Sequence, residues 1–569
     1  MKSLSALPRA LSVAFVVGVS LWCSLLLWCQ APPSPRSAKS SPKTFSAHRA
    51  AKHLPFVAKV PHPIGTKAHQ EVRRYLLASI RKLGFTPQLQ RGVVDHSLRL
   101  SRWRRYLRGA PLTNIFVHIK GKKSTGIVAV VSHYDSVRGA PGAGDDGAAV
   151  VAMLELMRAV RAHTPMQNDL LFLFTDGEEG GLLGAQLFMK KHPLAKKLGF
   201  IMNFEGRGNS GPGLMFETTP GNAKVIAEFA RVVPSPRTNS LAYEIYKLLP
   251  NDTDFSVFRR ANIPGVNIGL IQGVAHYHKP TDTIENLSLA SLQHHGEYML
   301  SMVRGFGQRD LRSLHGKEAV FFDVFGLYVV HYSVIWAWIW SLLGILLLGV
   351  IFWKLWKMGD LRPLCLCIAM CFHVVVWVVV TLLIGGLGYL LLMLKGKKLY
   401  AFYYTMRGEE WVFAGCMLLT WGLATMLWSL GSKIVSTHEE QLSVLCLWTL
   451  PMLASCFVWP GASYLFTWPL LLMSVLFLVE LFRDDVSHVW QTYIAGLVGE
   501  ILLMVLCVPL LMHIFYGMTF TLVAVTALLW LLFVSSMPRS RHVFDALVGR
   551  AHRLLFVVGS GAIVVGLII

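Results

Sequence analysis

Long apolar segments, separated by short polar ones, fill the second half of this chain of 569 residues. Eight of them follow residue 318, each near the ~20 residues that a helix needs to cross a bilayer. They are roughly 329–353, 364–394, 411–430, 442–459, 464–482, 490–513, 519–534 and 554–569. The whole chain is 54% hydrophobic and only 15% charged. This composition is typical of a membrane protein and predicts an all-α, polytopic membrane domain over 319–569.

The amino-terminal end carries another apolar stretch, at residues 11–29, behind Lys2 and Arg9. The stretch is long for a signal-peptide core, and no clear small-residue cleavage site follows it. We therefore expect residues 1–30 to be a transmembrane anchor, the first of nine spans. The Pro- and Ser-rich stretch behind it predicts a flexible linker over 31–54.

Residues 55–318 differ in pattern, because short apolar runs alternate with helical periodicity. The runs at 126–131, 170–174 and 200–205 are typical of buried strands, and 289–306 is typical of a helix. This alternation predicts an α/β domain, a mixed, mostly parallel sheet flanked by helices.

Each predicted strand ends in a side chain that can bind a metal. His133 follows the first run, Glu178 and Glu179 follow the second, and Glu205 closes the third. Sites in open α/β sheets form beyond the carboxyl ends of strands. We therefore expect these side chains to meet in one crevice.

The residue types suit hydrolytic zinc chemistry. Zinc accepts imidazole nitrogen and carboxylate oxygen, and a catalytic site keeps one position open for water. Two ions need a shared carboxylate, and Asp145 suits that role because it lies in a Gly-rich loop before a helix. One of the paired glutamates, Glu178 or Glu179, can bind metal while the other accepts a proton from water. Asp135, close behind His133, is placed to hold the imidazole tautomer.

Each motif alone also has an ordinary explanation. Glu-Glu pairs often start helices, where the helix dipole favours them, and Asp-Asp-Gly often forms a turn or helix cap. The occurrence of all of them, in order and after strands, favours the metal site.

The series H-Y-D-S-V, G-D-D-G-A, D-G-E-E-G-G-L-L-G, N-F-E and Y-H-x-x-x-D-T resembles the di-zinc aminopeptidases. That family includes bacterial leucine aminopeptidases and a membrane branch of endoplasmic-reticulum metallopeptidases and vacuolar membrane proteases. The resemblance covers about residues 55–308. It implies a zinc-exopeptidase fold, two Zn²⁺ ions, and hydrolysis of amino-terminal residues from peptides.

The resemblance also implies a role for each matching residue. The implied metal ligands are His133 and Glu205 for the first ion, Glu179 and His278 for the second, and Asp145 between them. Glu178 would be the general base, and Tyr277 would hydrogen-bond the tetrahedral intermediate. Asp252 and Asp254 lie in a segment similar to one that lines the family's cleft, and are candidates to hold a peptide's amino terminus. Helix capping explains these two aspartates equally well.

Two other functions stay open. Glutaminyl cyclases share the fold and much of the motif set but use one zinc ion, and the domain of a non-catalytic receptor or transporter could keep the same site for binding alone. Glu205 also departs from the aspartate frequent in the secreted enzymes, although the membrane branch tolerates glutamate. Gly147 after the Asp pair, with Leu183 and Gly184 after the Glu pair, favours the peptidase.

Short loops rich in Lys and Arg indicate the cytoplasmic side of a membrane protein. In a nine-span topology three basic groups share one side: Lys2 and Arg9; Lys354, Lys357 and Arg362; and Arg539, Arg541, Arg550 and Arg553. One basic loop does not fit this topology, because it falls on the opposite side; it contains Lys395, Lys397, Lys398 and Arg407. The α/β domain is then expected on the extracytoplasmic face, periplasmic in a bacterial inner membrane or lumenal in a eukaryotic organelle.

The formal net charge of +22 is concentrated between Arg36 and Arg108. No nucleic-acid-binding motif accompanies it, so no nucleic acid is expected as a partner. The expected partners are a peptide substrate and the lipid bilayer, whose anionic headgroups attract basic segments. The oligomeric state does not follow from the sequence.

Overall fold

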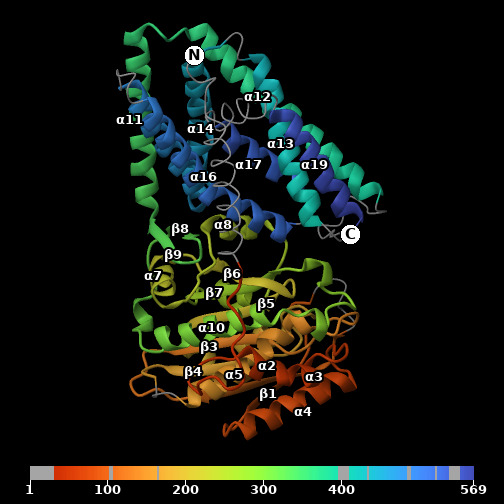
Figure 1. The fold of residues 1–569 in the computed structure, drawn as a ribbon. Coiled ribbons are helices and arrows are strands. Elements are labelled where there is room, and N and C mark those ends of the chain that lie inside the picture. The colour runs from red at the N-terminus through yellow and green to blue at the C-terminus, as the bar shows by residue number, and fades with distance from the viewer. Residues whose placement is uncertain are drawn as a thin grey trace. The chain divides into compact units, whose positions relative to one another are not determined.

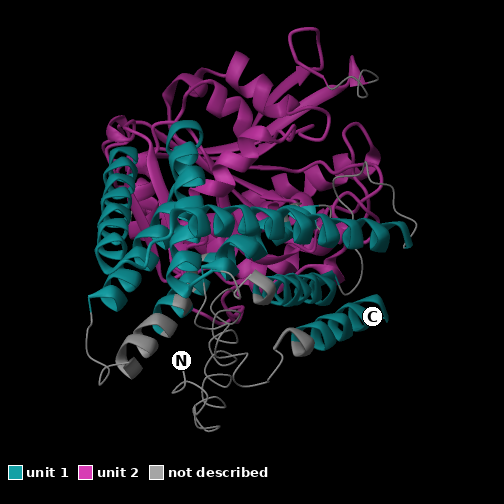
Figure 2. Cartoon of the chain, turned by 90° about the horizontal axis from the view of Figure 1, so that it is seen from above, with its two compact units in different colours: residues 1–29, 334–569 teal, residues 30–333 magenta. Residues whose placement is uncertain are grey.

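The computed structural model describes residues 31–100, 107–162, 166–394, 409–431, 435–482, 489–518, 522–536 and 551–568. The predicted anchor at 1–30 lies outside these residues. The chain divides into two compact units, one that ends at Ser333 and one that begins at Val334, and Figure 2 shows them in different colours.

A seven-stranded sheet in the order β1-β2-β4-β3-β5-β7-β6 forms the centre of the unit that ends at Ser333 (Figure 1). The strands are β1 (Gln88–Val93), β2 (Pro111–Ile119), β3 (Ile127–His133), β4 (Asp169–Thr175), β5 (Leu198–Gly206), β6 (Ser210–Thr218) and β7 (Gly265–Gln272). The four central strands β4, β3, β5 and β7 are parallel, whereas β1, β2 and β6 pair antiparallel. The predicted mixed sheet is confirmed.

Helices cover both faces of this sheet. They are α2 (Ala47–Ala50), α3 (Leu54–Val57), α4 (Lys67–Lys82), α5 (Ala148–Arg161), α6 (Leu183–Lys191), α7 (Ala223–Val232), α8 (Ser240–Leu248), α9 (Asp254–Arg260) and α10 (Leu289–Phe306). Side chains alternate between the two faces of a strand. Val128 and Val130 of β3 therefore lie in the hydrophobic core on one face, with residues of α5 and α10. Ala129 and Val131 lie in the core on the other face, with residues of α6 and α9. Because both faces are covered, β3 is buried throughout.

The segment expected to be a flexible linker, 31–54, packs on the α/β unit instead. Phe45, Ala47 and Ala50 are buried in its core. The Arg49 Nε atom lies 2.8 Å from Glu155 Oε1 on α5. These contacts correct the linker expectation, because a Pro- and Ser-rich composition does not reveal single apolar residues that dock elsewhere.

A hairpin of β8 (Ala319–Val324) and β9 (Tyr328–Ser333) ends this unit. Ser240 of α8 anchors the hairpin, since its hydroxyl donates to the Phe321 carbonyl at 2.9 Å and accepts the Phe321 N–H at 3.0 Å. The unit therefore extends past the boundary predicted at residue 318. The span predicted at 329–353 starts as a helix only at Val334.

The second unit is helical in the residues described. Its helices are α11 (Val334–Met358), α12 (Pro363–Leu394), α13 (Glu409–Gly431), α14 (Thr437–Val458), α15 (Tyr464–Leu481), α16 (Val489–Met518), α17 (Val523–Ser535) and α19 (Ala551–Ile568). Five helices of the described part, α11 to α15, are long and apolar enough to cross a membrane. They coincide with the first five spans predicted after residue 318. Shorter apolar stretches at Ile501–Tyr516, Val523–Ser535 and Leu555–Ile568 fall on the last three.

Candidate metal centre

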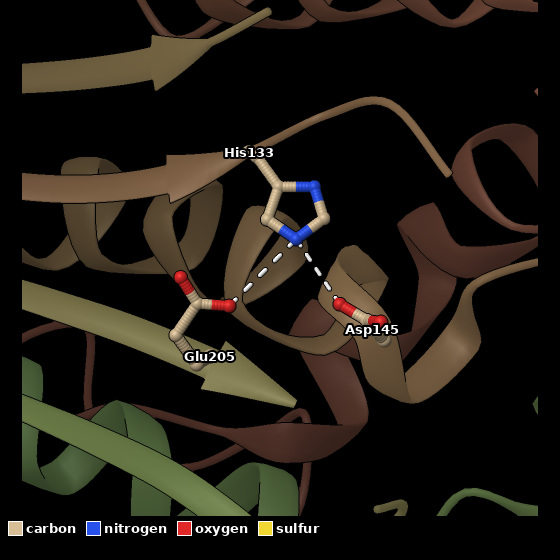
Figure 3. Close-up of side chains that lie close together, drawn as sticks. All are labelled: His133, Asp145 and Glu205. Carbon is tan, nitrogen blue, oxygen red and sulfur yellow. Dashed lines mark hydrogen bonds and ion pairs between the residues drawn. The ribbon is translucent and has the colours of Figure 1, made fainter. Parts of the chain in front are cut away.

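His133, Asp145 and Glu205 form one cluster at the carboxyl ends of the central strands (Figure 3). His133 ends β3, Glu205 lies near the end of β5, and Asp145 lies in the loop before α5. The His133 Nε2 atom is 3.1 Å from Asp145 Oδ1 and 3.7 Å from Glu205 Oε2. All three side chains are buried, and their ligand atoms converge on one point.

A second cluster shares Asp145 with the first. The other carboxylate oxygen of Asp145, Oδ2, lies 3.1 Å from His278 Nε2, and the same nitrogen lies 3.2 Å from Glu179 Oε1. Within each cluster the ligand atoms lie within 4.8 Å of one another. The two oxygens of Asp145 thus serve two separate sets of imidazole and carboxylate groups, an arrangement that suits one metal ion in each.

The charges of the site also fit bound cations. Asp145, Glu178, Glu179 and Glu205 are crowded together, and burial disfavours their charged forms. Burial raises the pKa of Glu178 well above its usual range, and the nearby Glu205 and Glu179 add to the shift while His133 opposes it. Burial likewise raises the pKa of Glu205 to about 8. Divalent cations would offset this excess of negative groups.

Asp135 organises the residues around the first cluster. The His133 Nδ1 atom lies 2.9 Å from the Asp135 carbonyl oxygen and 3.5 Å from its Oδ1, which leaves Nε2 facing the cluster. The Asp135 carboxylate also accepts the backbone N–H of Glu178 at 3.0 Å and that of Glu179 at 3.3 Å. One residue, through its carbonyl and its carboxylate, therefore positions both the His133 ring at the end of β3 and the loop after β4.

The predicted catalytic pair, Glu178 and Tyr277, lies beside the clusters. Burial raises the pKa of Tyr277 well above its usual range, and the neighbouring carboxylates of Asp145 and Glu179 add to the shift. The Tyr277 ring also stacks on His278, with ring centres 3.8 Å apart.

A cavity of about 340 Å³ opens next to Glu179 and His278. Its other lining residues are Pro63, Ile64, Thr66, Leu107, Asp135, Ser136, Val137, Arg138, Gly139 and Gly180. Its volume falls within the range of small-molecule sites. It is large enough to take part of a short peptide beside the metal ligands.

The two aspartates predicted to contact substrate have other partners. Asp252 is exposed and forms an ion pair with Arg260. Asp254 is buried at the start of α9, where its carboxylate accepts the hydroxyl of Thr175. Neither belongs to a metal cluster, and the N-cap of α9 is Thr253 rather than either aspartate, so a role in substrate binding stays a prediction.

Two further residues act on the clusters without belonging to them. Asp282 hydrogen-bonds the loop that carries Asp145, and Asn203 donates to Glu205 Oε1 at 2.9 Å. Asp282 is the aspartate of the motif Y-H-x-x-x-D-T and Asn203 is the asparagine of N-F-E, so both positions were visible in the sequence. Their partners were not, because hydrogen bonds between distant segments leave no local pattern.

Comparisons with known proteins bear on the same region. Residues 114–303 match the model of Peptidase family M28. Endoplasmic reticulum metallopeptidase 1 of Mus musculus is 32% identical over 231 residues, which are 39% of this chain and 26% of that protein. The vacuolar membrane protease of Candida dubliniensis is 28% identical over 242 residues, 42% of this chain and 26% of that protein. The matches thus span about a quarter of these relatives' length.

Solved structures similar to this chain include an aminopeptidase from Aneurinibacillus sp. strain AM-1, 15% identical, with a TM-score of 0.38 over 46% of this chain and 94% of that one. A glutaminyl cyclase of Fimbriiglobus ruber is 20% identical, with a TM-score of 0.38 over 48% of this chain and 100% of that one.

Proposed function

We propose that this chain, which carries a peptidase M28 domain and apolar helices able to cross a membrane, is a membrane-bound zinc aminopeptidase. Its substrates would be peptides, shortened from their amino termini. The observation that carries the proposal is the division of Asp145 between two clusters, with Oδ1 toward His133 and Oδ2 toward His278. That division supports two ions and favours the peptidase over a single-zinc cyclase.

The metal ligands would be His133 and Glu205, Glu179 and His278, and the shared Asp145. Zinc, when bound there, supplies Lewis-acid polarisation of a carbonyl group and lowers the pKa of water. The chain's own side chains have to orient the substrate and move the proton.

Glu178 is suited to the role of general base. Asp135 accepts its backbone N–H, and the Glu178 carboxylate lies beside His133, Glu205 and Glu179, next to the groups that would hold zinc and its water. In the proposed reaction Glu178 takes a proton from the attacking water and returns it to the leaving amine. Tyr277 donates its hydroxyl proton in a hydrogen bond to the oxyanion. The cavity beside Glu179 and His278 holds the adjoining part of the peptide.

The extracytoplasmic placement of the α/β unit is part of the proposal. The α/β unit ends at Ser333, a helix long and apolar enough to cross a membrane runs from Val334 to Met358, and basic residues lie at its far end, Lys357 in the last turn and Arg362 just after it. Because basic loops stay in the cytoplasm, this order of elements supports an extracytoplasmic domain. In this proposal the second unit is embedded in the lipid bilayer.

The test uses the full chain in detergent, loaded with zinc, and Leu-initiated peptides with free or acetylated amino termini. We expect hydrolysis of the free peptides only, and a loss of kcat of about 10²- to 10⁴-fold in Glu178→Gln with its zinc content retained. Glu244→Gln, a change at a buried glutamate on α8 that pairs with Lys247, is the matched control and should hydrolyse normally.

Other outcomes would replace the proposal. Unchanged turnover in Glu178→Gln would contradict the assigned mechanism. Ammonia release from Gln-initiated peptides without hydrolysis would indicate a cyclase. A zinc-loaded wild type that binds peptides without turning them over would indicate a binding module.

A further inference from the structure

Three buried polar side chains lie in a row across the neighbouring strands β5, β7 and β6, next to Glu205. Asn203 of β5 lies opposite Asn267 of β7 in the parallel register, and Asn267 lies opposite Glu217 of β6 in the antiparallel register. Asn203 and Asn267 are fully buried, and Glu217 is 2% exposed. We call Glu217, Asn267 and Asn203 the amide relay.

Each amide of the relay donates through its nitrogen, Asn267 toward Glu217 and the Thr253 hydroxyl, and Asn203 toward both Asn267 and Glu205. The Asn267 side-chain nitrogen donates to Glu217 Oε2 at 2.9 Å, and the Asn203 side-chain nitrogen donates to Asn267 Oδ1 at 3.0 Å. The same Asn203 nitrogen donates to Glu205 Oε1 at 2.9 Å. Glu205 Oε1 is thereby engaged, while Oε2 remains beside His133.

The orientation of these amides originates at Glu217. An ionised carboxylate accepts hydrogen bonds and cannot donate them, so it selects the nitrogen end of the Asn267 amide. That choice turns Asn267 Oδ1 toward Asn203 and forces Asn203 to present its nitrogen to Glu205. Burial raises the pKa of Glu217 to about 7, while the hydrogen bond from Asn267 and the Arg259 Nε atom, 2.9 Å from Glu217 Oε1, favour the ionised form, which therefore prevails above neutral pH.

We propose that the amide relay positions Glu205 as a ligand, and that Glu217, two strands away, thereby sets the metal affinity of the first cluster. This inference rests on the proposed function, because it requires that Glu205 bind a metal ion. The relay contacts Glu205, which belongs to the first cluster alone, and so its effect should be confined to one of two ions. Partners of this kind typically change metal affinity by about 10- to 100-fold.

Glu217→Gln tests the relay, because glutamine has the same shape and can donate. Residue 217 can then either accept or donate, so Asn267 is no longer held in one orientation. When Asn267 turns its oxygen toward residue 217, its nitrogen faces Asn203, and Asn203 then presents an oxygen to Glu205. Zinc affinity is measured on the purified full chain by competition with a chelator. We expect one of the two zinc ions to bind about 10- to 100-fold more weakly and the other to bind normally.

The matched control is Glu228→Gln. Glu228 of α7 is also 2% exposed and paired with an arginine, Arg231, but it lies outside the relay. Its substitution should leave both affinities unchanged. The double variant Glu217→Gln/Asn267→Asp should restore the first affinity. In that variant the carboxylate introduced at position 267 accepts hydrogen bonds from the new glutamine and from Asn203, so Asn203 again presents its nitrogen to Glu205.

The outcomes separate this inference from the proposed function. A wild type that binds fewer than two zinc ions contradicts the proposed function itself. A wild type with two ions and a Glu217→Gln variant with unchanged affinities overturns the relay alone, as does an equal loss in Glu228→Gln or a double variant without recovery. If Glu217→Gln does not fold, Asn203→Ala removes the last link instead, and the same selective loss is expected.

Discussion

The carboxylate of Asp282 holds the backbone of Asp145 in place. Asp282 Oδ2 accepts the Asp145 N–H at 3.2 Å, and Oδ1 accepts the Gly144 N–H at 2.7 Å. The Asp282 carbonyl accepts the Ala143 N–H at 3.2 Å. Because His278 lies shortly before Asp282 in the chain, one short segment supplies a metal ligand and also fixes the loop of the ligand that both clusters share.

Asp282→Ala is therefore expected to weaken both metal sites. The substitution leaves two buried N–H groups without their acceptor and frees the loop that carries Asp145. We expect both zinc affinities to fall by about 10-fold or more, by analogy with other residues that support metal ligands. Chelator competition measures this, with Asp310→Ala, the loss of an exposed helix-capping aspartate, as control. Loss of only one ion would show that Asp282 serves His278 rather than Asp145.

Asp135→Asn should impair turnover more than metal content. Asparagine keeps one acceptor oxygen but presents an N–H group toward one of the backbone N–H groups of Glu178 and Glu179. The general base is then displaced, and kcat should fall by about 10- to 100-fold while zinc stays bound, as for other partners of site residues. Steady-state kinetics with zinc analysis of the same samples measures both. A normal kcat would mean that the loop holds its position without Asp135.

Zinc binding should release protons near neutral pH. Burial disfavours the charged imidazole of His278, but hydrogen bonds with Asp145 and Glu179 outweigh it and raise the pKa to about 10. Burial raises the pKa of Glu205 to about 8, although His133 opposes the shift. Both groups hold protons below these values in the metal-free protein and must lose them to bind a metal.

The affinity for zinc is accordingly expected to rise with pH between about pH 6 and 8, since fewer protons compete as pH increases. Titration calorimetry in buffers of different ionisation enthalpy counts the protons released. Binding that releases none, or that weakens as pH rises through this range, would contradict the assigned ligands.

A charged pair in the second unit offers a prediction independent of metal. Arg362 donates to the buried carboxylate of Glu439 from Nε at 2.9 Å and from Nη2 at 2.7 Å. Arg362→Ala leaves Glu439 with only the backbone N–H groups of Ser436 and of residue 362, so the membrane unit should lose about 1–3 kcal/mol of stability. Thermal unfolding in detergent tests this, and zinc affinity should not change. An unaltered unfolding midpoint would show that the pair contributes little.

Three of the five ligands, His133, Glu179 and Glu205, were predictable because each lies at or just after the end of a recognisable strand. The apolar runs at 126–131, 170–174 and 200–205 correspond to β3, β4 and β5, and the helix predicted at 289–306 is α10. Parallel strands bring their carboxyl ends to one edge of a sheet, so local periodicity was enough to bring these residues together.

The supporting contacts were not predictable in the same way. The amide relay depends on the strand order β5-β7-β6, in which a strand late in the sequence inserts between two earlier ones. Arg49 binds Glu155, which lies 106 positions later in the chain. The sequence does not reveal this contact, so the Pro- and Ser-rich stretch that contains Arg49 was expected to be a linker. Partners so distant in sequence leave no periodic signal, whereas ligands at strand ends do.

The number of zinc ions bound by wild type, Asp145→Ala and Glu205→Ala tests the central claim most directly. If Asp145 is shared between the clusters, wild type binds two ions, Glu205→Ala keeps the ion at Glu179 and His278, and Asp145→Ala loses tight binding of both. A wild type that binds a single ion, or an Asp145→Ala variant that still binds two tightly, would contradict a metal pair joined by this carboxylate.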